Sequence, residues 1–179
     1  MTYCPQHFTT MRILLTSLLI LTGFCTLQAA DPNSAQVAIN ALPDKYRDGV
    51  LKVSADNGTP NPSTWYILAK NSRQDGAMYQ VGIAQGQVVS EKISLDLRAA
   101  IRDSSIDLSK VLIDSDGAWA AGQQYSASKG KTLANASYAL QQQGRDASPI
   151  WSIWCYDKNV RYIGLVKILA TTGAVVSSE

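Results

Sequence analysis

One theme occurs twice in this 179-residue chain, and it limits the possible folds more than any other feature. Trp65 is followed by the run Gly86-Gln-Val-Val-Ser-Glu91, and Trp151 is followed by Gly173-Ala-Val-Val-Ser-Ser-Glu179. The two tryptophans are 86 positions apart and the two glycines 87 positions apart. A nearly constant period indicates an internal duplication, so the sequence predicts two tandem copies of one structural unit.

The first thirty residues have the layout of a cleaved secretory signal. Arg12 precedes the apolar run Ile13–Phe24, and the small-residue site Thr26–Ala30 follows it. The apolar run is short for a bilayer span. We therefore expect cleavage near Ala29 or Ala30 and a periplasmic or secreted protein that is not inserted in the membrane afterwards.

Cleavage at this site changes the inventory of reactive groups. It removes the only histidine, His7, and two of the three cysteines, Cys4 and Cys25, so that Cys155 alone remains. No intramolecular disulfide, Ser-His-Asp or Cys-His catalytic set, or zinc site of His and Cys can then form. A lipoprotein is not expected, because Phe24 precedes Cys25 where lipid attachment requires a small residue. Without a nearby histidine, Cys155 is expected to be a small buried hydrophobe.

The charge balance argues against two classes of partner. The chain has 16 Lys and Arg against 14 Asp and Glu, and the loss of Arg12 would leave a net charge near +1. Nucleic acids and anionic membranes are expected to select a basic excess or a basic stripe. We therefore expect no nucleic-acid partner and no membrane-surface partner.

Each copy is predicted to be a helix followed by several strands. In the first copy, Ser34 can cap a helix that runs through Leu42 and is kinked or ended by Pro43. Gly, Asn and Asp residues mark the turns between the strands that follow. The strands are predicted at Val50–Ala55, Thr64–Lys70, Met78–Gln85 and Gln87–Glu91, with turns at Asn57-Gly58, Asp75-Gly76 and Gly86.

In the second copy, the turn Asp114-Ser-Asp-Gly117 leads into a helix from Ala118 to Lys129, which Gly130 ends. Ser115 or Asp116 is the expected cap. The strands are predicted at Ala136–Gln142, Ile150–Tyr156, Arg161–Ala170 and Ala174–Ser178.

The segment Lys92 to Leu112 connects the two copies, and its residues Ile93, Leu97 and Ile101 fit a short helix. The overall class is predicted to be α+β, with helices packed on one face of an antiparallel sheet. The predicted organisation is a signal peptide at residues 1–30, a first repeat at 31–91, a bridging segment at 92–112 and a second repeat at 113–179.

Alternation along the strands assigns the aromatic residues to two faces. Trp151 shares a face with Ile153 and Cys155, and Trp65 holds the matching position in the first copy, so we assign this face to the core. The opposite face gives the candidate binding surface, because aromatic residues are enriched among binding anchors. The alternative is that the other copy or the bridging segment covers this face. The candidate residues are Trp154, Tyr156, Tyr66 and Leu68.

Three stretches of the second copy carry a further likeness. Asp114-Ser-Asp-Gly-Ala-Trp119 opens a helix, Pro149-Ile-Trp151 opens a strand, and Val166-Lys-Ile-Leu-Ala-Thr-Thr-Gly173-Ala-Val175 lies near the end. Together they resemble a PepSY-type domain over residues 112–179. The likeness departs from the family at Leu169, where an acidic residue is usual.

The first copy, residues 33–91, is similar to the same family only through Val81-Gly-Ile-Ala-Gln-Gly86-Gln-Val-Val89. The resemblance implies an exported or membrane-attached module with one helix on a small antiparallel sheet. Such modules occur in peptidase propeptides, where an inhibitory role has been suggested. The family has no agreed catalytic residues, so none is carried over to this chain.

Two enzymatic or metal-binding interpretations are disfavoured by spacing. The Asp114 turn begins like a calcium loop, but Ala118 and Tyr125 stand where acidic ligands are required. A carboxylate hydrolase would need two carboxyls across a cleft, such as Asp56 with Asp157, and nothing in the spacing brings such a pair together. We therefore expect no cofactor, no metal and no catalytic residues.

Two hypotheses of different classes remain. The favoured one is an exported non-enzymatic binding module that engages or inhibits a peptidase or another envelope protein, through its sheet face or its strand edges. The alternative is a small-ligand carrier or a structural envelope protein. An enzyme is the third option.

Overall fold

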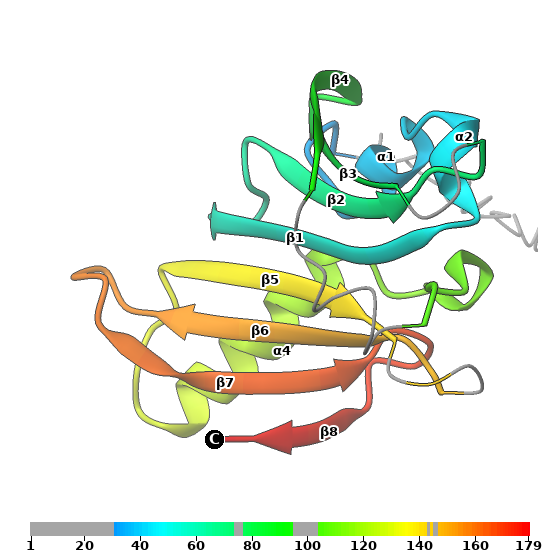
Figure 1. Cartoon of the computed structure of the whole chain (residues 1–179). Coiled ribbons are helices and arrows are strands. Elements are labelled where there is room, and N and C mark those ends of the chain that lie inside the picture. The colour runs from blue at the N-terminus through cyan, green and yellow to red at the C-terminus, as the bar shows by residue number, and fades with distance from the viewer. Residues whose placement is uncertain (1–30, 74–76, 95–103, 143, 145–146) are drawn as a thin grey trace, which may run out of the picture.

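The computed structural model describes residues 31–73, 77–94, 104–142, 144 and 147–179. These residues form an eight-stranded antiparallel sheet with helices against it (Figure 1), which confirms the predicted α+β class. The predicted signal peptide, the turn at Asp75-Gly76, and Leu97 and Ile101 of the bridging segment lie outside the described residues. The strands are β1 (Val50–Gly58), β2 (Trp65–Lys70), β3 (Met78–Ala84), β4 (Gln87–Ile93), β5 (Asn135–Gln141), β6 (Ile150–Tyr156), β7 (Tyr162–Leu169) and β8 (Val175–Ser178).

The strand order is β4-β3-β2-β1-β5-β6-β7-β8, so β1 and β5 lie in the middle and β4 and β8 form the two edges. The strands β1 to β4 follow one another outward from the centre, and β5 to β8 do the same in the other direction. The two runs join where β1 pairs with β5, with Val53 opposite Leu140 and Ser54 opposite Ala139. One backbone hydrogen-bond ladder therefore connects both parts of the chain.

The helices lie on one face of this sheet (Figure 1). The longest, α4 (Ser115–Ser128), packs on β6 and β7, whereas α1 (Ala35–Asn40) and α2 (Asp44–Arg47) pack on β2. A short 3-10 turn, η1 (Leu108–Lys110), precedes α4. The opposite sheet face carries none of these elements.

The start of α1 agrees with the prediction, and the start of α4 corrects it. The Ser34 side chain accepts a hydrogen bond from the Val37 N–H at 3.3 Å, as expected of a cap. In α4 the cap is Asp114, whose carboxylate accepts from the Ser115 N–H at 2.7 Å, so the helix begins three residues before Ala118. The first acidic residue of the turn takes the cap because an Asp side chain is an efficient acceptor for free N–H groups.

Other boundaries differ in ways that have local causes. The helix α1 ends at Asn40 with Ala41 as its C-cap, before the predicted end at Leu42. Pro43 is the N-cap residue of α2, a four-residue helix that is too short for a periodicity signal. The strand β1 continues through Gly58, because Asn57 adopts a positive φ of 58° within a β-bulge rather than in a hairpin turn. Ile93 belongs to β4 and is 68% exposed, so its assignment to a bridging helix is wrong. Gly130, at φ 65°, ends α4 as predicted.

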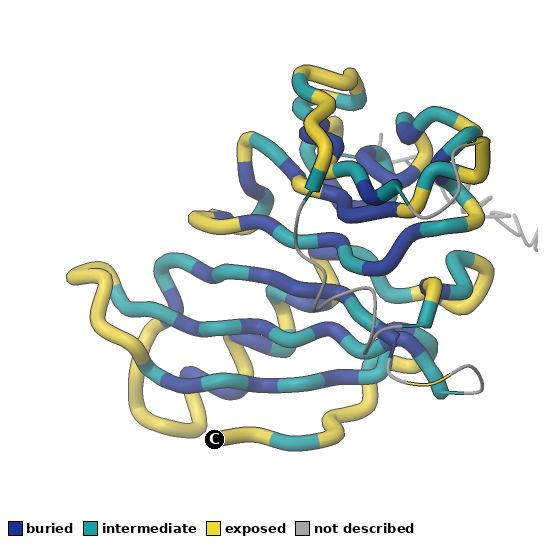
Figure 2. Tube along the Cα trace, viewed as in Figure 1, coloured by how far each residue is buried: buried dark blue, intermediate teal, exposed yellow. Residues whose placement is uncertain are grey.

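A continuous apolar core lies between the sheet and the helices and extends under both halves of the sheet. Figure 2 shows the resulting alternation of buried and less buried residues along β5, β6 and β7. Three aromatic rings meet at the junction of β1 and β5. The centroid of Trp65 lies 5.7 Å from that of Tyr138 and 6.1 Å from that of Trp151. Aromatic packing at these separations stabilises the junction beyond the burial of area alone.

Candidate functional site

The two faces of β6 are filled as the alternation predicted. Trp151, Ile153 and Cys155 are fully buried under α4, whereas Trp154 and Tyr156 are partly exposed on the opposite face. The two tryptophans, three positions apart, therefore serve different faces of the sheet. Trp151 belongs to the core, whereas packing of the core does not account for Trp154.

The two buried tryptophans fix the helices to the sheet in the same way. The indole N–H of Trp65 donates to the Asn33 carbonyl at 2.8 Å, and that of Trp151 donates to the Ile113 carbonyl at 2.8 Å. Asn33 and Ile113 each directly precede the cap of a helix. Each indole thus satisfies its polar atom inside the core while holding the start of a helix over its own strand.

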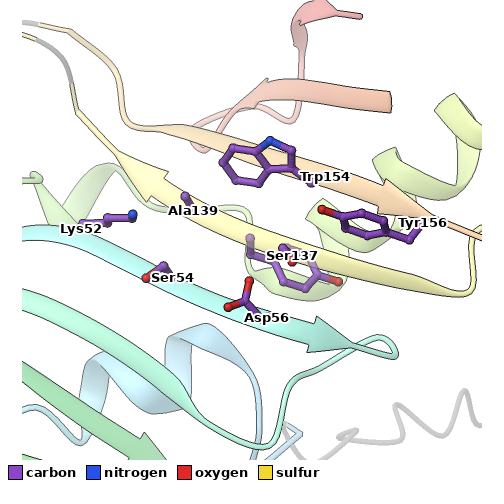
Figure 3. Close-up of a pocket in the computed structure, with 8 residues that line it drawn as sticks. Lys52, Ser54, Asp56, Ser137, Ala139, Trp154 and Tyr156 are labelled. Carbon is purple, nitrogen blue, oxygen red and sulfur yellow. The ribbon is translucent and has the colours of Figure 1, made fainter. Parts of the chain in front are cut away.

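The open sheet face carries a hollow of about 310 Å³ above the junction of β1 and β5. Trp154 and Tyr156 border it on β6, as Figure 3 shows, and polar side chains of β1 lie on the other side. The sequence reasoning identified the two aromatic residues but missed the contribution of β1. The lining residues are Lys52, Ser54, Asp56, Ser137, Tyr138, Ala139, Trp154 and Tyr156.

Tyr66 and Leu68, the other two predicted residues, lie in an adjoining hollow of about 160 Å³ that shares Lys52 and Ser54 with the first. Tyr66 is 42% exposed and available to a partner. Leu68 is 8% exposed, because it packs in a small separate cluster. The structure therefore places all four predicted residues on one face, but Leu68 offers little accessible surface. The other members of its cluster are Leu51 and Met78.

The two hollows together form a trough with small residues along its floor. Tyr66 lies opposite Ser54, Ser54 opposite Ala139, and Ser137 opposite Trp154 in the strand register. The walls stand on β2 and β6, which are three strand spacings apart, or about 14 Å. We call this surface the open-face trough: the walls are Tyr66, Trp154 and Tyr156, and the floor is Lys52, Ser54, Asp56, Ser137 and Ala139.

Two opposite charges stand along the trough on the same strand. Neither Lys52 nor Asp56 makes an ion pair or side-chain hydrogen bond within the described part of the chain. Residues four apart on a strand share a face and lie about 13 Å from each other. Asp56 begins the β1 bulge that contains Asn57, and bulges commonly redirect side chains beside functional sites.

Cys155 lies outside the trough and has the properties of a core residue. It is a free cysteine, fully buried, with its Sγ 3.9 Å from the Gly122 carbonyl of α4. Burial raises the pKa of its thiol, because the thiolate would lose its hydration. The thiol is therefore kept neutral and packs as a small apolar group.

Three of the four carboxylates considered for catalysis or metal binding accept hydrogen bonds within the fold. Asp114 caps α4 and also accepts from the Gln36 N–H at 2.9 Å, while Asp116 accepts from the Asn61 amide at 2.9 Å. Asp56 lies in the trough, whereas Asp157 lines a different hollow and accepts two backbone N–H groups. Among the described residues no group of three or more His, Cys, Asp or Glu is placed to hold a metal ion.

The two sheet edges have a shared irregularity. In β4 the register shifts so that Val89 has no partner on β3, and in β8 Val176 is left out in the same way opposite β7. Both side chains are more than half exposed. Bulges at edge strands bend the backbone away from a regular ladder and oppose the addition of another strand. The edges are therefore less suited to a partner than the trough is.

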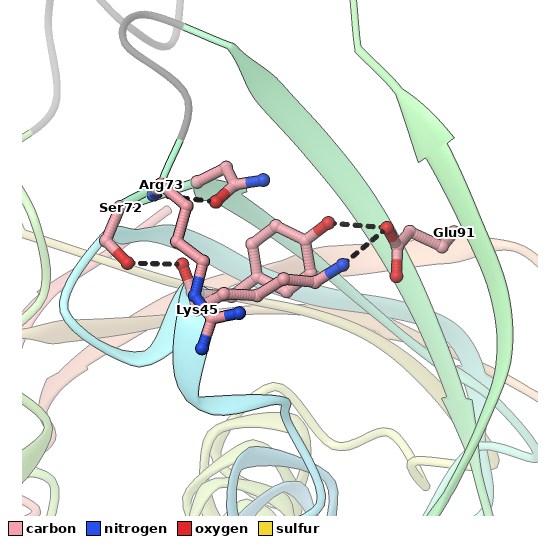
Figure 4. A network of polar contacts seen from close by, with 6 residues as sticks. Lys45, Ser72, Arg73 and Glu91 are labelled. Carbon is pink, nitrogen blue, oxygen red and sulfur yellow. Dashed lines mark hydrogen bonds and ion pairs between the residues drawn. The ribbon is translucent and has the colours of Figure 1, made fainter.

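Side chains of α2 form hydrogen bonds to the edge strand β4. The Glu91 carboxylate accepts from the Tyr46 hydroxyl at 2.7 Å and from the Lys45 ammonium at 3.0 Å (Figure 4). These two hydrogen bonds, that of Tyr46 first, hold the pKa of Glu91 below its usual range. The network stabilises the position of β4, and its three residues do not line either hollow of the trough.

Comparison of the chain with protein-family models, with curated proteins and with solved structures finds no match in any of the three. Helices in the described part of the chain are too short or too polar to cross a membrane. A functional assignment therefore has to start from the open-face trough itself.

Proposed function

We propose that this chain is an exported, non-enzymatic binding module of two PepSY-like repeats, and that it engages a protein or peptide through the open-face trough. The observation that carries the proposal is the trough on the sheet face opposite the helices: three aromatic side chains and two charges that have no partner among the described residues. Exposed aromatic residues beside polar groups are typical of protein-binding anchors.

Matching features of the two halves support the interpretation as repeats of one unit. Trp65 and Trp151 stand on the second strand of each half and make the same hydrogen bond to the residue before a helix cap. Val89 and Val176 are the extra residues of bulges on the last strand of each half. An internal duplication is expected to preserve such local geometry while the intervening helices diverge in length.

A peptidase is the partner class that the PepSY resemblance favours, and an exported location follows from the layout of the first thirty residues. A small-ligand carrier fits the geometry less well. Sites for small molecules generally bury most of the ligand surface within a cleft. The trough is open to solvent along the sheet and is suited to a partner that brings its own surface.

Affinity capture from an envelope extract of the source organism, combined with inhibition assays on secreted peptidases, tests the proposal. The purified protein is expected to retain a protein partner, and the double variant W154A/Y156A is expected to retain at least tenfold less. The matched control is V89A/V176A, which truncates exposed apolar residues on the edges and should bind normally. Loss of the partner only in the edge variant would contradict the trough. Clean captures together with thermal stabilisation by a small molecule would favour the carrier.

A further inference from the structure

We propose that the open-face trough selects an extended partner segment with a defined order of side chains: an acidic residue against Lys52, an apolar residue two positions on, and a basic residue four positions on against Asp56. This inference rests on the proposed function and specifies the ligand of the same site.

The two free charges carry the first step. Lys52 and Asp56 line the trough and have no partner within the described part of the chain. A ligand that covers them removes water from both, and an uncharged ligand would leave each charge partly desolvated and unpaired. A ligand that lies along the trough therefore has to supply a carboxylate at one end and a cation at the other.

Spacing indicates the conformation of the ligand. In an extended chain, residues i and i+4 point to the same side and lie about 13 Å apart, which matches the separation of Lys52 and Asp56 on β1. Strands that pack face to face align within about 30° of one another. An extended segment along β1 and β5 therefore fits both the spacing of the two charges and the direction of the floor strands.

The register of the strands assigns a surrounding to each position of the segment. Ser54 and Ala139 lie side by side at the middle level, next to Tyr66, and leave room for an apolar side chain. Trp154 lies opposite Ser137, at the level of Asp56. A basic side chain there would meet the Asp56 carboxylate and an aromatic ring, and arginine is the residue that best combines an ion pair with a cation–π contact.

Charge reversal with matched peptides tests the inference. Three fluorescently labelled peptides, Glu-Thr-Leu-Thr-Arg, Arg-Thr-Leu-Thr-Arg and Glu-Thr-Leu-Thr-Glu, capped at both ends, are titrated into the purified protein by fluorescence anisotropy. The unmodified protein is expected to prefer the first peptide at least fivefold. K52E is expected to prefer the second peptide, and D56K the third. K158E, which makes the same charge change in the exposed turn after β6, is the control and should keep the preference of the unmodified protein.

Three results would overturn the inference. They are equal binding of all three peptides, preferences that K52E and D56K leave unchanged, or quenching of the Trp154 fluorescence by a neutral oligosaccharide but by none of the peptides. A partner captured by the unmodified protein, lost in W154A/Y156A and unaffected by K52E and D56K would overturn this inference alone. Capture that survives W154A/Y156A as well would overturn the proposed function too. K52E and D56K are expected to fold normally, because Lys52 and Asp56 lie outside the core. Circular dichroism checks the folding of each variant.

Discussion

Tryptophan is found in opposite environments on the two faces of the sheet. Trp151 is buried beneath α4 and donates its N–H to a backbone carbonyl, whereas Trp154, three residues later, borders the open-face trough together with Lys52 and Asp56. On the covered face the two indole N–H groups donate to backbone carbonyls and the apolar side chains are packed. The open face has accessible rings and two charges without a partner among the described residues. The comparison teaches that the buried apolar contacts lie mainly on one face, so substitutions on the other face are expected to cost less stability.

The largest effect expected from this comparison is on stability and comes from Trp151→Ala. Removing a fully buried tryptophan costs about 3–5 kcal/mol, from lost burial and from the cavity that remains. The Ile113 carbonyl would also lose its donor. Urea denaturation followed by circular dichroism measures the change in unfolding free energy.

The control for this prediction is Trp154→Ala, which removes the same side chain from the other face. We expect its cost in unfolding free energy to be about 1 kcal/mol or less, because the residue is not part of the core. Equal destabilisation by the two variants would break the distinction between the faces. Acrylamide quenching should also fall more in the Trp154→Ala variant than in Trp151→Ala.

The next effect concerns the close approach of α4 to the sheet at Gly122. A Cβ on this residue would lie 3.3 Å from the Cys155 Sγ and 3.3 Å from the Ile153 Cγ2. Gly122→Leu should therefore force the helix outward and cost about 1–3 kcal/mol by overpacking. Gln123→Leu, on the exposed side of the same helix, is the control and should change the unfolding free energy little. If Gly122→Leu left the unfolding free energy unchanged, α4 would not pack against the sheet as closely as the structure shows.

The sequence predicted what depends on short-range alternation. The bounds of β6 and the two faces of Trp151 and Trp154 follow from a period of two within one strand. The pairing of β1 with β5 could not be predicted, because it joins residues about eighty positions apart and no local signal specifies it. For the same reason Lys52 was missed and Asp56 was considered only as a catalytic carboxylate, since both become part of the trough only through that pairing. The alternation of Lys52, Ser54 and Asp56 with apolar neighbours was the available signal.

A smaller effect is expected at the start of the helices on the covered face. Asp114 accepts hydrogen bonds from the N–H groups of Ser115 and of Gln36 in α1, so one carboxylate serves two helices. Asp114→Ala should cost about 1–2 kcal/mol, toward the upper part of the range for a lost cap. Asp114→Asn retains an acceptor oxygen and should recover most of this loss in urea denaturation. An equal loss of unfolding free energy in both variants would indicate that the charge of Asp114, not its hydrogen bonds, stabilises the two helix starts.

The smallest effect is a pH dependence at the edge strand β4. The pKa of Glu91 is lowered, first by the Tyr46 hydroxyl and then by Lys45, so the folded state holds the carboxylate ionised more firmly than the unfolded chain does. Its contribution to stability is therefore full above the ordinary carboxyl pKa of 4.5 and is lost as the pH falls through the lower folded value. Glu91→Gln should lower stability at pH 7, and the difference from the unmodified protein should shrink toward zero in acid.

Asp48→Asn, which removes a carboxylate without an ion pair in the described chain, is the control for general charge effects. A difference between Glu91→Gln and the unmodified protein that stays constant from pH 7 to pH 3 would show that the network does not depend on the ionised carboxylate.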